Sequence, residues 1–107
     1  MIRLAALFLC FFSLLSGPVR AADTPTAVVE KLHGALIQSM KGGAKMGFAG
    51  RKTLLDPVVR DAYDLPAMAR VATGTAWAKM SDEEKKGVTD AFADWTVATY
   101  ASQFKSF

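Results

Sequence analysis

The side chains that most often carry chemistry are few and scattered in this 107-residue chain. Its one histidine, His33, has no partner cysteine or second histidine nearby, and a zinc site needs three or four such ligands at defined spacing. The clustered acidic side chains fall at an expected helix start and on its polar face, where they serve the helix dipole and solubility: Asp82, Glu83, Glu84, Asp90 and Asp94. We therefore expect no catalytic residue, no metal site and no cofactor, and the chain is not expected to be an enzyme.

Glycines and cations crowd residues 41–52, which read KGGAKMGFAGRK. The spacing of Gly42 and Gly47 is similar to that of a phosphate-binding loop, but Phe48-Ala49 stands where such a loop needs Lys followed by Ser or Thr. The four cations here either meet an anionic surface or belong to a solvated loop, and the second interpretation is favoured: Lys41, Lys45, Arg51 and Lys52.

Large aromatic side chains are the most informative group: Phe48, Trp77, Phe92, Trp95, Tyr100, Phe104 and Phe107. Their helical spacing favours packing in a core. Several of them facing one another with few small residues between could equally line a cavity for an apolar ligand. The sequence leaves both interpretations open.

Residues 1–21 predict a cleaved secretory signal peptide. Arg3 precedes an apolar run over residues 4–15, and Val19-Arg20-Ala21 offers small residues three and one before a cut after Ala21. A helix over residues 4–15 spans only about 18 Å, against roughly 30 Å for the hydrocarbon core of a bilayer, which favours cleavage over anchoring. We expect Sec-type export to the periplasm.

Removal of this segment changes the charge balance. The full chain has 13 Lys and Arg against 10 Asp and Glu, and loss of Arg3 and Arg20 reduces the net charge from +3 to +1. A net charge this small does not predict a nucleic-acid partner. The single cysteine, Cys10, leaves with the signal peptide, so apolar packing must hold the mature chain together without disulfides.

Residues 22–107 predict one mainly α domain of four to five helices, because apolar residues recur at helical spacing and no segment alternates with the period of a strand. The first helix is expected to begin at Thr24-Pro25 and to end before Gly42-Gly43. Residues 41–52 are expected to form a loop anchored in the core by Met46 and Phe48. A second helix over residues 51–63 contains Pro57, which is expected to kink it or to mark a restart capped by Asp56.

The second half of the chain has clear helix signals. Asp64 is expected to cap a short helix over residues 65–73 that ends at Gly74. Ser81 begins a capping box, followed by a last helix that reaches about residue 104. The side chains expected to face inward are Met68, Val71, Ala72 and Trp77, followed by Val88, Phe92, Trp95 and Thr99 on the last helix.

An ordered set of motifs covers nearly all of the mature chain: Gly47-Phe48-Ala49-Gly50-Arg51, Leu54, Pro57, Asp64-Leu65-Pro66-Ala67-Met68-Ala69-Arg70, Gly74, Trp77, Glu84, Ala91-Phe92 and Thr99-Tyr100-Ala101. In this order and spacing the set resembles the MlaC family, nearest its toluene-tolerance and hopanoid-associated (HpnM) branch. The resemblance implies a soluble periplasmic carrier that encloses acyl chains. Such a carrier passes phospholipid, or a hopanoid in the HpnM branch, between an outer-membrane lipoprotein complex and an inner-membrane ABC transporter.

The resemblance also implies a longer chain. The complete family fold is α+β, and its twisted sheet and much of its lipid cavity have no counterpart here, so residues 22–107 are expected to be its helical N-terminal part. The candidate lipid-contacting residues are Met68, Val71, Phe92 and Trp95. Arg70 contacts a headgroup phosphate or pairs with Asp61 or Asp64, and the ion pair is favoured.

Two other functions remain open at this stage. The chain could be a small helical interaction protein with a filled core and no ligand. It could also be a non-functional truncated remnant.

Overall fold

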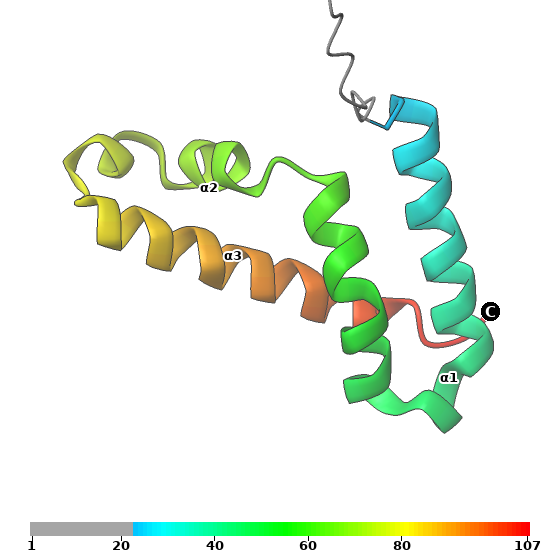
Figure 1. Ribbon diagram of the computed structural model, residues 1–107. Helices are drawn as coiled ribbons and strands as arrows, with labels where there is room; N and C mark the ends of the chain where they lie inside the picture. Colours follow the sequence, from blue (N-terminus) through cyan, green and yellow to red (C-terminus); the bar gives the residue numbers. More distant parts are fainter. Residues whose placement is uncertain (1–22) are drawn as a thin grey trace, which may run out of the picture.

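The computed structural model describes residues 23–107, so the predicted signal peptide lies outside the described residues. The elements in chain order are α1 (Pro25–Ala62), α2 (Leu65–Thr73), the 3-10 helix η1 (Gly74–Lys79) and α3 (Asp82–Gln103). The described part contains no strand, and the predicted mainly α fold is confirmed. Figure 1 shows α1 folded back on itself in two arms, with α2 lying along α3.

Two glycines break α1 into arms that span residues 25–42 and 48–62. Gly43 has φ 45° and Gly47 has φ 68°, values that side chains other than glycine rarely adopt. The predicted loop over residues 41–52 is therefore too long, because helical geometry fails only around these two positions. Gly42 and Gly50 remain helical and make room for Met46, whose side chain lies 2.5 and 2.6 Å from where their Cβ atoms would be.

Pro57 neither kinks the second arm nor restarts it, contrary to the prediction. The helix continues through Pro57. Proline lacks the backbone N–H that would bond the carbonyl one turn earlier, but Pro57 faces solvent, so this unpaired carbonyl is not buried. Asp56 does not act as a cap, because its Oδ1 accepts a hydrogen bond from Arg60 Nε at 3.0 Å.

Four predicted helix ends are confirmed: Thr24, Asp64, Gly74 and Ser81. Thr24 caps α1 by accepting from the amide of Ala27, and Asp64 caps α2 in the same way from Ala67. Gly74 ends α2 at φ 58°, and the Ser81–Glu84 capping box is complete. These signals act within one turn of helix, so the sequence alone determines them.

The core forms where both arms of α1 meet the C-terminal half of α3. Its buried side chains are Ala35, Leu36, Leu55, Val59, Val97 and Ala101. The predicted inner face of α3 is wrong at Trp95, which is 65% exposed, whereas Val88, Phe92 and Thr99 are half-buried and Ala93, Thr96, Val97 and Ala101 are buried. Small side chains let α3 approach its neighbours closely, and the larger residues lie outside this contact. Trp77, predicted to be buried, is half-buried beneath the ammonium group of Lys85.

A buried arginine joins the break in α1 to the end of α3. Arg51 is only 7% exposed; its Nε donates to the carbonyl of Ala101 and its Nη1 to the carbonyl of Gly43, both at 2.8 Å. Ala101 lies in the last turn of α3, where carbonyls lack a helical partner and the dipole attracts cations. Arg51 is thus a structural residue, not part of the solvated basic loop predicted from the sequence.

Replacement of this arginine should destabilise the fold. We expect Arg51→Met to lower the free energy of unfolding by about 3 kcal/mol, because two charge-assisted hydrogen bonds are lost and their buried acceptors are left unpaired. Arg70→Met, at an exposed arginine, should change it by less than about 0.5 kcal/mol. Urea unfolding followed by circular dichroism measures both values, and equal stability of the two variants would contradict this role.

A pair of tyrosines adds a pH-dependent contribution to stability. Tyr63 and Tyr100 share a hydrogen bond between their hydroxyls, which together with partial burial raises the pKa of Tyr100 from 10.0 to about 12. The folded state therefore holds the Tyr100 proton more tightly than the unfolded state, so this contribution is complete below pH 10 and is lost as the pH rises through 12.

Tyr100→Phe should flatten this alkaline loss while retaining the stacking of residue 100 on Phe104. The check is the urea midpoint of both proteins measured between pH 9 and 12, a range set by the shift itself. The other ionisable groups are the same in both proteins, so the difference between the two curves reports the Tyr63–Tyr100 pair. Parallel curves would rule out the shift.

Candidate functional site

An open apolar groove of about 400 Å³ lies between α2 and α3. Its walls are almost entirely hydrocarbon, with one carboxylate residue at the edge: Asp64, Ala67, Met68, Val71, Ala72 and Phe92. Five of these residues belong to α2 or its cap and Phe92 belongs to α3, and Figure 1 shows the two helices side by side. A groove of this size and lining suits an apolar ligand, because small-molecule sites usually measure roughly 300–1,000 Å³.

The groove exists because α2 buries its other face. Leu65 and Ala69, one turn apart, pack inward and are 5% and 0% exposed. Met68 and Val71 consequently lie on the outer face of this short helix, 38% and 77% exposed. Across the groove, α3 buries the small residue Ala93 against the molecule and leaves Phe92 half-buried in the wall.

The structure brings together three of the four predicted lipid-contacting residues. Met68, Val71 and Phe92 line the same groove, although the two residues of α2 were expected to face inward and do not. Trp95 does not line the groove, but its ring centroid lies 6.2 Å from that of Phe92, so it extends the exposed apolar surface along α3.

Arg70 does not form the ion pair that the sequence favoured. Within residues 23–107 no carboxylate lies within 4.0 Å of its guanidinium group, although both predicted partners, Asp61 and Asp64, are in this range. Arg70 instead borders a shallow hollow with Pro66 and Trp77, and this hollow shares Asp64 and Ala67 with the groove. Its charge is free to meet a ligand at the end of α2.

The sequence analysis did not identify Asp64, Ala67 and Ala72 as groove residues. Their signal is the helical repeat itself, since residues 64, 68, 71 and 72 follow the spacing of one helix face. The repeat identifies the face, but it does not reveal whether protein or solvent covers it.

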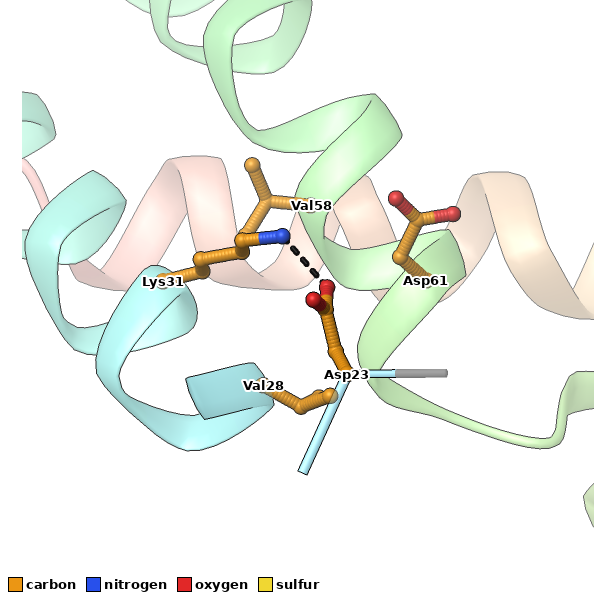
Figure 2. Close-up of a pocket in the computed structure, with 5 residues that line it drawn as sticks. All are labelled: Asp23, Val28, Lys31, Val58 and Asp61. Atoms are coloured by element: carbon orange, nitrogen blue, oxygen red, sulfur yellow. Dashed lines mark hydrogen bonds and ion pairs between the residues drawn. The ribbon is translucent and has the colours of Figure 1, made fainter. Parts of the chain in front are cut away.

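Two other hollows lie beside α1, one charged and one apolar. Figure 2 shows a charged cleft of about 290 Å³ between the arms of α1, lined by Asp23, Val28, Lys31, Val58 and Asp61. Lys31 pairs with Asp23, and this hydrogen bond and charge raise the pKa of the lysine. A second apolar hollow, of about 380 Å³, contains His33 beside Leu36, Ile37, Met40 and Phe104.

His33 is exposed and lies among apolar side chains. Across residues 23–107, no three side chains of the metal-ligating types gather into a possible site. In the same range, no helix combines the length and the apolar character needed to cross a bilayer.

Comparison with known proteins yields one match. No curated protein and no solved structure matches the chain. A family model described as MlaC protein matches residues 30–107, a span that includes most of the first arm of α1, all of the second arm, the groove and all of α3. Because this match covers most of the sequence, the chain belongs to the MlaC family, whose members are periplasmic lipid-binding proteins.

Proposed function

We propose that this chain is a lipid-binding carrier component of an ABC-type transport system that moves phospholipid or hopanoid between the inner and outer membranes. In this proposal residues 1–21 direct export and are removed, and residues 22–107 form the helical part of a periplasmic lipid-carrier domain. The cargo assignment follows the resemblance to the toluene-tolerance and HpnM branch.

One observation carries the proposal: a member of a lipid-binding family has an apolar groove with large side chains facing outward. Val71 is 77% exposed, and Met68 and Phe92 stand beside it. Exposure of a valine and a methionine together has a hydrophobic cost that contact with an acyl chain would remove, at about 0.8 kcal/mol for each buried CH₂. Transfer then needs no bond chemistry, because the groove replaces the bilayer as the environment of the lipid tail.

Arg70 supplies a place for the opposite end of the lipid. It is exposed, carries no ion pair with residues 23–107 and lies on the same short helix as Met68 and Val71. We assign it to a headgroup phosphate, for which a guanidinium group offers bidentate hydrogen bonds. The candidate site is therefore Met68, Val71, Phe92 and Trp95 for the tail and Arg70 for the headgroup.

The alternative of a helical interaction protein with a filled core rests on another observation. Leu55, Val59 and Val97 are fully buried in the central core, where side chains of α1 and α3 pack on one another. The two proposals differ only in what covers the groove, a lipid tail or the surface of another protein.

Lipid extraction separates the two. The protein, expressed from its full sequence and purified after export, should carry phospholipid or hopanoid that organic extraction and mass spectrometry identify. A folded, monomeric protein that carries no lipid and takes up none from vesicles would refute the carrier proposal. The lipid class found also decides between the phospholipid and hopanoid branches.

Charge placed in the groove should weaken binding. Val71→Glu sets a carboxylate against the tail and removes contact with two or three methylene groups, which corresponds to at least about tenfold weaker lipid binding. Val29→Glu is the matched control, since Val29 is an exposed valine on the first arm of α1. A fluorescent fatty-acyl phospholipid titrated into each variant measures the effect, and equal affinities for the two variants would place the tail elsewhere.

A further inference from the structure

We propose that the turn between the two arms of α1 is a docking surface for an anionic phospholipid bilayer. We call this surface the α1 tip and define it as residues 41–48 together with Lys105. The α1 tip is distinct from the groove, which lies on α2 and α3. The groove would hold one lipid, whereas the α1 tip would contact the surface of a membrane.

The α1 tip presents cations and large apolar side chains together. Lys41 and Lys45 are exposed, and between them Gly43 lies against the backbone of the exposed Lys105, whose carbonyl would be 3.1 Å from a Cβ at that position. Phe48 is 46% exposed and Met46 is 36% exposed. A phenylalanine beside several lysines is the composition with which peripheral proteins enter the interfacial region of anionic bilayers.

Charge is strongly segregated toward this end of the molecule. No aspartate or glutamate occurs in residues 31–55 or in residues 95–107, the two segments that meet at the α1 tip. The acidic residues lie elsewhere, among them the cluster Asp82, Glu83 and Glu84 in the first turn of α3. Because residues 22–107 have a net charge of only +1, attraction to an anionic surface must come from this local arrangement.

The structure also holds the α1 tip in one conformation. The buried Arg51 donates a hydrogen bond to the carbonyl of Gly43, and Ser39 Oγ donates one to the carbonyl of Phe104 at 2.6 Å. Met46 fills the space left by two glycines. The lysines and Phe48 are thus presented on a fixed turn, which lowers the entropy lost on docking.

The exposed cations of the α1 tip are lysines, and this favours a bilayer over a protein as the binding partner. Lysine is depleted from the cores of protein interfaces, whereas each lysine near an anionic lipid surface strengthens binding about fivefold. The apolar groove is lined by α2, its cap and α3, and none of its residues belongs to the α1 tip. Docking through the α1 tip therefore does not cover the groove.

Flotation with vesicles tests the proposal. The protein, expressed from its full sequence and purified after export, should float with vesicles that contain phosphatidylcholine and phosphatidylglycerol. It should float much less with phosphatidylcholine alone, and added salt should release it. Lys45→Glu should reduce the bound fraction by about tenfold, because one attractive charge is replaced by a repulsive one. Lys79→Glu makes the same charge change at an exposed lysine away from the α1 tip and should leave binding within about twofold.

Phe48→Ser, with Val29→Ser as its control, tests the apolar contribution separately. Phe48→Ser should weaken flotation with the anionic vesicles at low salt, where the unchanged protein is bound, and Val29→Ser should not. Circular dichroism verifies that each variant is folded. Equal effects of Lys45→Glu and Lys79→Glu, or equal flotation of the protein with both kinds of vesicle, would overturn the proposal. Lipid uptake by the groove is measured independently, so either proposal can fail without the other.

Discussion

The arrangement of the helices depends on one buried cation, Arg51, whose guanidinium group requires hydrogen-bond acceptors inside the protein. The guanidinium group of Arg51 finds them in the carbonyls of Gly43 and Ala101, which belong to segments far apart in the sequence. Gly43 can offer its carbonyl because a positive φ turns the backbone there. Both acceptors lie at interruptions of helices, where carbonyls have no helical partner. The same contact therefore fixes the turn of α1 and the position of α3 across its arms, and the core forms between them.

Several large apolar side chains on α2 and α3 lie outside the packed core. The core buries Leu55, Val59 and Val97 together with alanines, while Met68, Val71 and Trp95 remain exposed. Burial of such large side chains contributes most to the hydrophobic effect, so their exposure leaves apolar surface in contact with water. This exposed surface around α2 and α3 agrees with contact to hydrocarbon, which is the ligand expected of the MlaC family.

Local features of the fold could be predicted from the sequence, and long-range features could not. The caps at Thr24, Asp64 and Ser81 involve residues within one turn, so their side chains are a sufficient signal. The burial of Arg51 depends on a carbonyl 50 residues away, and nothing near Arg51 in the sequence indicates it. The inner face of α3 was misassigned because hydrophobicity favours Trp95, whereas close helix contact requires small side chains. For the candidate site, Met68, Val71 and Phe92 lie around one groove, and their assignment to a lipid stays a prediction. Whether they face the core or solvent depends on which side of α2 packs, which the sequence does not reveal.

The most direct test of the account is to locate the lipid tail on the protein. A phospholipid with a photoreactive group in its acyl chain, bound to the protein and irradiated, can be mapped by peptide mass spectrometry. The account predicts crosslinks concentrated on residues 64–72 and on Phe92 and Trp95, with few on the arms of α1. Crosslinks concentrated at the second apolar hollow, around Ile37, Met40 and Phe104, would contradict it.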